Sequence, residues 1–314
     1  MSSLRTLLVV GPLLALLALT GASAQDKKKI TVATDPKEAG VDFAVQGEYV
    51  PKQKSEMAAQ VVARGGGKFD VYFLEGGLPG DGWNKKTRIK STAMLDADEK
   101  GAAIKGAGFG GTITLGKETI LQGESEKFGK FVLARVVRKS PTLGARPPER
   151  ARVLFDGKSA DAWKEGKLAG DLLPVAANSK DKLTFSKLHV EFVSPFMPYA
   201  GGQGRGNSGV YFIGGDGPEI QVLDSFGLKG ENNECGGIYG RRAPDVNMCF
   251  PPLSWQTYDI ELSRQEAGVK LTVYHNGVKV HENVDIGKKG SGPIHLQNHG
   301  DRVFYKNIWL VEAK

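Results

Sequence analysis

Short alternating segments separated by glycine are the feature that most constrains the fold of this chain. Glycine occurs 42 times in 314 residues and falls between short apolar–polar runs instead of collecting in one linker. Side chains that alternate with a period of two predict half-buried β-strands, and glycine supplies the turns between them. Helical periodicity is nearly absent. The sequence therefore predicts an all-β protein, with strands at "KFDVYFLEG", "FVLARVVRK", "SGVYFIG", "PEIQVLDSF" and "WQTYDIELSRQ".

A proline-rich stretch divides these strands into two sets. The prolines of residues 141–150 lie among charged and small residues, a composition typical of an exposed linker. We therefore expect a smaller β-rich domain at residues 25–140 and a larger one at residues 151–314.

The second set of strands contains a strong hairpin signal. Asn276 and Gly277 stand between two alternating segments, and both central positions of a type I′ turn require a positive φ. About seven such strands over some 160 residues suggest a jelly-roll sandwich of two antiparallel sheets.

The N-terminal 24 residues have the composition of a secretory signal peptide. Arg5 precedes an apolar run through Leu19, and a small-residue A-S-A sequence ends at Ala24. The apolar run is shorter than the roughly 20 residues that cross a bilayer, and no later segment is long or apolar enough. We expect export to the periplasm or the extracellular space after cleavage near Ala24, in a form that could associate with the cell envelope.

The cysteines and the net charge restrict the chemistry further. Cys235 and Cys249 lie close together in a chain expected in an oxidising compartment, which predicts a disulfide between them. The formal charge of +7 is spread along the chain, so a solvated surface is favoured over nucleic-acid binding. No H-E-x-x-H, G-x-S-x-G, P-loop or C-x-x-C sequence is present, which leaves zincin, α/β-hydrolase, nucleotide and redox sites without support.

Two histidines near the C-terminus flank a glutamine in "HLQNH". On a strand, His295, Gln297 and His299 would share one face. The two histidine Cα atoms would then lie roughly 13 Å apart, too far to ligate one ion unless the strand bends. Gly300 could permit a bend just after the pair. A polar row on a binding face is therefore favoured over a shared metal site.

The segment "PEIQVLDSF" repeats this pattern. Glu219 and Gln221 would share a face, with Asp224 near the strand end. Two polar strands of this kind predict the floor of a concave site, although polar side chains on an outer sheet face give the same alternation.

Several aromatic residues could complete a sugar site. Tyr211, Tyr239 and Trp255 are candidates to stack on a sugar ring, whose hydroxyl groups need directed hydrogen bonds. Each of these side chains could equally belong to the core or a corner of the sandwich.

Four ordered motifs in the second half are similar to one known family. The segments "RVLFDGKSADAW", "RGNSGVYFIGGDGPEIQVLDSFG", "CGGIYGRRAPDVNMCFPPLSWQTYDIEL" and "GPIHLQNHGDRVFYKNIWL" resemble the 3-keto-disaccharide hydrolase family, formerly a domain of unknown function. The resemblance covers about residues 152–312. "DFAVQGEYV" and "GGLPGDGW" also resemble an accessory β module that precedes this domain in exported planctomycete proteins.

The resemblance implies a concanavalin-like jelly roll that cleaves glycosides carrying a 3-ketone. The ketone makes the C2 proton acidic, so one base can start an elimination that expels the group on C1. For this chemistry, our hypothesis gives Glu219 and His299 the roles of catalytic base and acid, in either order. No cofactor is identified, but a divalent cation could stabilise the enolate. The residues implied in binding the glycoside or oligosaccharide are Arg205, Asn207, Gln221, Asp224, Tyr239, Arg242, Trp255 and Gln297.

The same residues leave a second class of function open. A non-catalytic carbohydrate-binding or cell-surface adhesion protein would keep the jelly roll and its stacking residues without turnover. The pairing of Glu219 with His299 favours the enzyme, since a pure binder has little use for a carboxylate next to an imidazole. His295 is the weaker candidate, because the family carries Arg or an unrelated residue there.

Overall fold

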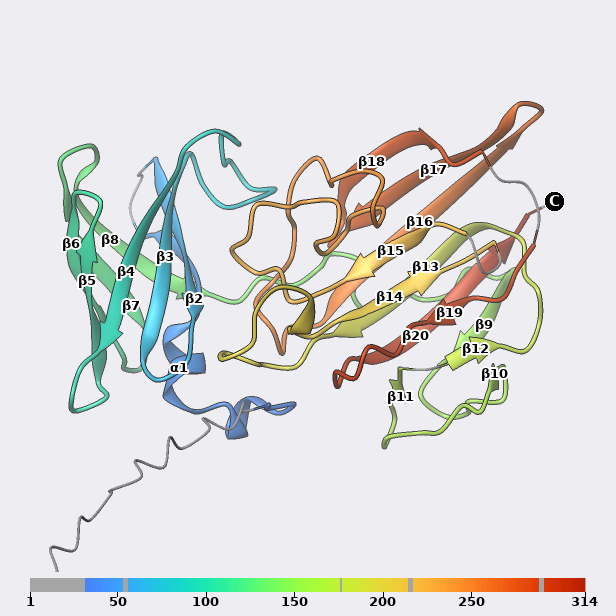
Figure 1. The fold of residues 1–314 in the computed structure, drawn as a ribbon, viewed down its shortest axis with the longest axis horizontal. Helices are drawn as coiled ribbons and strands as arrows, with labels where there is room; N and C mark the ends of the chain where they lie inside the picture. The colour runs from blue at the N-terminus through green and yellow to red at the C-terminus, as the bar shows by residue number, and fades with distance from the viewer. Residues whose placement is uncertain (1–31, 53–55, 176, 214–216, 288–290, 314) are drawn as a thin grey trace, which may run out of the picture.

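The computed structural model describes residues 32–313 with gaps at 53–55, 176, 214–216 and 288–290. It consists of 48% strand and 4% helix, which confirms the all-β prediction. An eight-stranded barrel and a two-sheet sandwich lie side by side along the long axis (Figure 1). The predicted signal peptide at residues 1–24 lies outside the described part of the chain.

The N-terminal half forms a closed antiparallel barrel. Each strand pairs with its neighbour in sequence, and β1 also pairs with β8, which closes the cylinder. Its core includes Phe73 stacked on Phe109 with ring centroids 3.8 Å apart. Before the barrel come η1 (Pro36–Glu38) and α1 (Gly40–Val45). The barrel strands are β1 (Gly47–Pro51), β2 (Met57–Ala63), β3 (Lys68–Glu75), β4 (Arg88–Leu95), β5 (Gly101–Gly106), β6 (Phe109–Thr114), β7 (Ile120–Ser125) and β8 (Gly129–Val136).

The C-terminal half is a sandwich of two antiparallel sheets. The larger sheet has the order β11-β20-β13-β16-β17-β18, with β9 also paired to β20, and the smaller one has the order β10-β12-β19-β14-β15. The larger sheet contains β9 (Ala151–Phe155), β11 (Leu173–Pro174), β13 (Phe185–Val193), β16 (Gln256–Gln265), β17 (Gly268–His275), β18 (Val278–Asp285) and β20 (Phe304–Glu312). The smaller sheet contains β10 (Trp163–Lys164), β12 (Ala177–Ser179), β14 (Ser208–Tyr211), β15 (Glu219–Val222) and β19 (His295–Leu296), and η2 (Gly202–Gly204) precedes β14.

Alternation along the strands builds the core between these sheets. Leu188 and Val190 of β13 point to the same core as Val210 of β14 and Ile220 of β15. The predicted hairpin joins β17 to β18. Asn276 has φ 50° and Gly277 φ 77°, so both central positions are left-handed and the type I′ prediction is confirmed.

The barrel packs directly against a loop of the sandwich. Val62 and Tyr72 of the barrel belong to the same buried cluster as Phe226 of the sandwich. A Cβ added at Gly227 would lie 2.3 Å from Val62, so only glycine permits this approach. Arg88 lies 3.5 Å above the Tyr72 ring and donates to the Gly227 carbonyl. The two halves therefore share an apolar interface in addition to their covalent connection.

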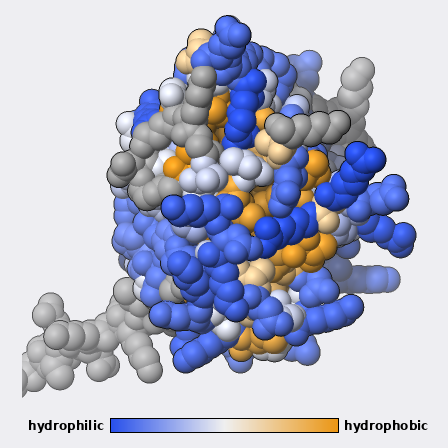
Figure 2. Space-filling model, turned by 90° about the vertical axis from the view of Figure 1, so that its right-hand side faces the viewer, coloured by the Kyte–Doolittle hydropathy of each residue, from blue (hydrophilic) through white to orange (hydrophobic). Residues whose placement is uncertain are grey.

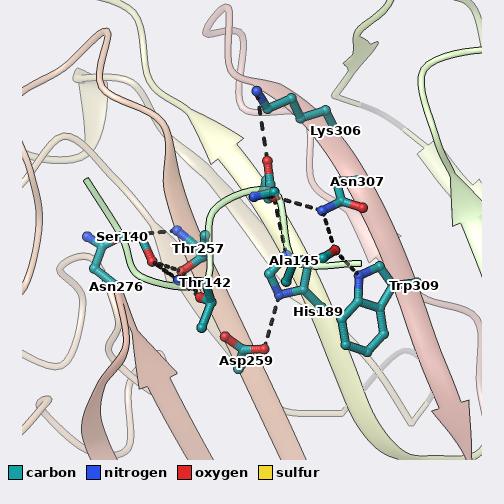
Figure 3. A network of polar contacts seen from close by, with 12 residues as sticks. Ser140, Thr142, Ala145, His189, Thr257, Asp259, Asn276, Lys306, Asn307 and Trp309 are labelled. Atoms are coloured by element: carbon teal, nitrogen blue, oxygen red, sulfur yellow. Dashed lines mark hydrogen bonds and ion pairs between the residues drawn. The ribbon is translucent and has the colours of Figure 1, made fainter. Parts of the chain in front are cut away.

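The segment that connects the halves is only partly exposed. Residues 146–150 are exposed, as expected for a linker. Residues 140–145 instead lie on the outer face of the larger sheet, where they hydrogen-bond to three of its strands (Figure 3). Proline and small residues predict local backbone conformation, but they do not reveal that a distant sheet offers hydrogen-bond partners.

The predicted disulfide between Cys235 and Cys249 is absent, and both residues are buried free thiols. The Cys235 sulfur lies 3.1 Å from the Tyr258 hydroxyl, and the Cys249 thiol donates to the Leu223 carbonyl at 3.5 Å. The two thiols are close enough for each to shift the pKa of the other. This proximity is what the sequence separation indicated, but polar contacts take the place of the covalent bond.

The surface is largely hydrophilic at the end of the sandwich away from the barrel, which Figure 2 views. A strip of hydrophobic side chains runs between hydrophilic ones on this face. The strip faces away from the barrel, so barrel packing does not cover it. Among the described residues, no helix has the length and apolar character needed to cross a membrane.

Candidate active site

Three neighbouring strands of the smaller sheet form the candidate site. In the antiparallel register, Tyr211 of β14 lies opposite both Glu219 of β15 and His295 of β19. These three side chains stand in one row across the sheet, because directly opposed residues project from the same face. The alternate residues Val210, Ile220 and Leu296 are fully buried in the core. The sheet therefore presents a polar row over an apolar base.

Two neighbouring side chains hold Glu219, and a third supports one of them. The Tyr211 hydroxyl donates to Glu219 Oε2 at 2.6 Å and accepts from Gln297 Nε2 at 3.1 Å. The Gln221 amide lies 2.8 Å from Glu219 Oε1, so turning its nitrogen toward that oxygen supplies a second donor. A Cβ at Gly209 would stand 2.2 Å from Glu219 Oε1, so the absence of a side chain there makes room for the carboxylate.

The environment of Glu219 changes its acidity. The side chain is 7% exposed, and this burial raises its pKa. The hydrogen bond from Tyr211 and the charge of His299 act in the opposite direction but do not cancel the effect. A carboxylate with a raised pKa accepts a proton more readily near neutral pH. The geometry therefore suits Glu219 to proton transfer.

His299 lies on the exposed turn that follows β19. Its charge lowers the pKa of both Glu219 and Asp301. Burial raises the pKa of Asp301, whose carboxylate accepts the backbone N–H of Asn207 at 2.7 Å. His299 therefore interacts electrostatically with Glu219 and Asp301.

Buried amides extend the site on its other side. Asn207 is 1% exposed and donates to the Gln203 carbonyl at 2.7 Å. Its side-chain oxygen lies 3.2 Å from the Gln221 amide, which links it to Glu219 through one residue. Asn207, Gln221 and Gln297, all predicted from the sequence, therefore belong to the same cluster as Glu219.

Two polar atoms at the site have no partner within the described structure. Gln297 Oε1 and His295 Nδ1 are both buried without a hydrogen bond to any described residue. Buried polar groups in folded proteins are nearly always paired, so unpaired atoms beside a perturbed carboxylate are available to a ligand. His295, the weaker candidate from its sequence, lies with its ring 5.4 Å from that of Tyr211.

Tyr239 stands at the open edge of the site. Its backbone N–H donates to the Glu219 carbonyl at 3.0 Å, and the residue is 44% exposed. The preceding residue, Ile238, bridges to Ile220, so this loop continues the sheet beyond β15. Tyr239 thus offers an exposed aromatic ring next to the catalytic candidate.

Three predicted binding residues have other contacts. Arg205 and Asp224 form a buried ion pair at 2.7 Å, which ties the loop before β14 to the end of β15. Arg242 pairs with Asp245 at 3.0 Å on the surface. The charges of both arginines are therefore directed at carboxylates of the protein, and that of Asp224 at Arg205.

Trp255 lies apart from the polar row. The Lys306 ammonium is 3.9 Å from the centroid of the Trp255 ring and also contacts Glu191 at 3.8 Å. Glu191 belongs to the outer face of the larger sheet, so the structure does not bring Trp255 to Glu219. Sequence order alone could not assign this tryptophan to a face.

The residues offer little to a metal ion. No three His, Cys, Asp or Glu side chains converge as a possible metal site in the described ranges. Tyr211 and Gln221 also occupy the two oxygens of Glu219. The divalent cation considered from the sequence therefore finds no fitting set of ligands, and no chemical step is assigned to one.

The sequence did not predict three of the contacts in this site. They are made by Tyr211 to Glu219, by Asp301 to Asn207, and by Gln203 to Asn207 and Gln221. Tyr211 was considered only for stacking, because its contact with Glu219 depends on strand register. Asp301 follows two residues after His299 in "HGD", a proximity that could have identified it. Gln203 lies in the short helix η2, where no alternation marks a polar face.

Known proteins place this site in context. The family model for the 3-keto-alpha-glucoside-1,2-lyase-like domain matches residues 150–311. A candidate glycosyl hydrolase of Parabacteroides distasonis is 28% identical over 53% of this chain and 85% of its own, with a TM-score of 0.46. A second from that organism is 18% identical over 53% and 95%, with a TM-score of 0.42. No curated protein sequence matches.

The family match begins just before β9 and ends within β20, so it spans the complete sandwich and every residue of the polar row. The chain belongs to the 3-keto-alpha-glucoside-1,2-lyase-like domain family.

Proposed function

We propose that this protein cleaves 3-keto-glycosides by removing the C2 proton and eliminating the group on C1. The observation that carries the proposal is a buried carboxylate of raised pKa, Glu219, beside the unpaired atoms of Gln297 and His295. Membership of the family supports a 3-keto sugar as the substrate class. The alternative, binding without turnover, gives no reason to place Glu219 beside an imidazole.

The reaction balances without an external oxidant or reductant. Glu219 takes the C2 proton, and the C2–H electron pair forms an enolate with the C3 ketone. The enolate then collapses to a C1–C2 double bond as the C1–O bond breaks and its electrons pass to the leaving oxygen. A proton from His299 neutralises that oxygen. Water can later add across the double bond to give the free 3-keto sugar.

The chain's other residues position the substrate. Gln297 Oε1 can accept a sugar hydroxyl, and His295 Nδ1 can hydrogen-bond to another, because neither atom has a described protein partner. Tyr239 offers a ring face at the edge of the cluster. The charge of His299, which acts on Glu219, would also stabilise the negative charge that develops on the enolate.

Release of p-nitrophenol from p-nitrophenyl 3-keto-α- and 3-keto-β-glucoside tests the function. The full chain is expected to cleave at least one of them and to leave the parent glucosides intact, since those lack an acidic C2 proton. Reactions with and without a chelator test whether a cation contributes. Binding of the 3-keto-glucosides without any release would instead support the non-catalytic alternative.

Tyr211 should influence the pH range in which Glu219 is deprotonated and can act as a base. Its hydrogen bond lowers the Glu219 pKa, so Tyr211→Phe should raise that pKa. Because a base must be deprotonated, the acid limb of the kcat/KM profile should move to higher pH. Tyr239→Phe, which keeps the ring and changes no side-chain contact with Glu219, is the matched control. An acid limb that stays in place or moves to lower pH in Tyr211→Phe would contradict this role.

Gly209 should be required for the position of Glu219. The Cβ of Gly209→Ala would collide with Glu219 Oε1 at 2.2 Å, so the carboxylate must move. We expect turnover to fall at least tenfold with little change in the circular dichroism spectrum. Gly110→Ala is a control, since no described atom lies within 4 Å of its added Cβ. Equal activity of both variants and the parent would show that the carboxylate position is unimportant.

We further propose that the protein is exported and that its barrel is an accessory module, which attaches to the cell envelope by contacts that leave Glu219 free. The signal-like composition of residues 1–24 supports export. N-terminal sequencing of secreted protein should then give a chain that begins near Gln25.

A further inference from the structure

A buried charged cluster on the outer face of the larger sheet plays no part in the proposed reaction. His189 of β13 is fully buried between Asp259 of β16 and Glu191 of its own strand. Its Nδ1 lies 3.0 Å from Asp259 Oδ1, and its Nε2 lies 3.4 Å from Glu191 Oε1. The imidazole also stacks on Trp309, with ring centroids 5.0 Å apart (Figure 3).

The charges of this cluster depend on one another. Burial alone would lower the pKa of His189, but the hydrogen bonds and charges of Asp259 and Glu191 outweigh it and raise that pKa. The pKa values of both carboxylates are lowered, because their hydrogen bonds and ion pairs, first among them those with His189, outweigh their own burial. Lys187 reaches Asp259 at 3.5 Å, and Lys306 reaches Glu191 at 3.8 Å.

The cluster holds the segment that connects the barrel to the sandwich. The Gly144 N–H donates to Glu191 Oε1 at 2.5 Å. Asn307 donates to the same oxygen at 2.8 Å and to the Ala145 carbonyl at 3.0 Å. Trp309 Nε1 reaches that carbonyl at 3.2 Å, so the ring that stacks on His189 also contacts the segment. Figure 3 shows the segment crossing β13, β16 and β20 above these side chains.

Further contacts continue toward the barrel. Ser140 Oγ and Thr142 Oγ1 lie 2.6 Å and 2.8 Å from Thr257 Oγ1. Arg138 donates to Glu48 of the barrel at 2.6 Å and lies 4.9 Å from the Phe250 ring of the sandwich. The backbone leaving β8 is therefore fixed to both halves within a few residues of the cluster.

We propose that His189, Glu191 and Asp259 form a charged clasp that fastens residues 140–145 to the sandwich and thereby fixes the orientation of the barrel. Rising pH removes the His189 proton and leaves two buried carboxylates without their central cation. Falling pH protonates the carboxylates and removes their attraction for it. The clasp should hold between the lowered carboxylate pKa values and the raised His189 pKa, and weaken outside that window.

Hydrogen exchange of the full chain tests the clasp. In Glu191→Gln and His189→Gln, residues 143–145 should exchange at least tenfold faster, with less than a twofold change in β2, β3, β14 and β15. His281→Gln is the matched control, because His281 is buried in the same sheet but its hydrogen bond is to the Gly236 carbonyl, away from the cluster. The parent should show the same acceleration at high pH, after correction for intrinsic exchange rates.

The orientation of the barrel is tested by the distance between two spin labels, measured by pulsed electron paramagnetic resonance. The labels are attached at Lys105→Cys in the barrel and Glu282→Cys in the sandwich. The distribution should broaden in Glu191→Gln and stay unchanged in His281→Gln. The proposed clasp is contradicted if both cluster variants leave the exchange of residues 143–145 unchanged, or if they accelerate exchange equally throughout the sandwich. An unchanged distance distribution in a variant whose segment exchanges faster would overturn the role in barrel orientation.

Discussion

Glu219→Gln is expected to lower turnover of a 3-keto-glucoside by at least about 100-fold, because a positioned general base contributes on the order of 100-fold or more. Glutamine keeps the shape of the side chain and can still accept from Tyr211, but it cannot take the C2 proton. His299→Gln should lower turnover by more than about tenfold through loss of the acid. Initial rates of aglycone release, measured at saturating substrate, give both values.

Glu282→Gln provides the control for a lost surface carboxylate, since its partner is the exposed Lys279. This variant should retain the turnover of the parent. The catalytic assignment fails if Glu219→Gln and His299→Gln are as active as Glu282→Gln while all three remain folded.

Arg205→Met is expected to destabilise the fold by about 3 to 5 kcal/mol, because it leaves a buried carboxylate without its cation. Arg205 and Asp224 are 3% and 2% exposed, and their contact at 2.7 Å is the ion pair that joins the loop before β14 to the end of β15. Urea unfolding followed by tryptophan fluorescence measures the change.

Arg242→Met is the matched control, because it removes an arginine from an exposed ion pair with Asp245. Surface pairs contribute less than about 1 kcal/mol, so its unfolding midpoint should stay near that of the parent. Equal effects of the two variants would mean that the buried pair is not what holds this loop.

Strands in which large apolar residues alternate with polar ones could be predicted from the sequence. Strands that turn small residues toward the core could not. β3 and β16 have that pattern, whereas β4 turns the small Ser91 and Ala93 inward, which leaves little hydrophobic contrast. Closure of the barrel requires β1 to pair with β8, more than 80 residues away. No local pattern encodes such a pairing, so the sequence predicted a β-rich domain but not a closed barrel.

The candidate site could likewise be predicted only in part from the sequence. Alternation placed Glu219 and Gln221 on one face, and the structure adds that this face meets Tyr211 and Gln297 from neighbouring strands. The opposition of Tyr211 and Glu219 follows from register, which the sequence leaves open. Trp255 could not be placed because a residue at a strand end can turn to either face.

Cleavage in D2O tests the central claim most directly. If Glu219 removes the C2 proton and elimination follows, addition of solvent must restore hydrogen at C2, so the released 3-keto sugar should carry one deuterium there. A reaction without enzyme corrects for exchange next to the ketone. Aglycone release by the full chain that leaves protium at C2, beyond this correction, would contradict elimination and indicate direct displacement at C1.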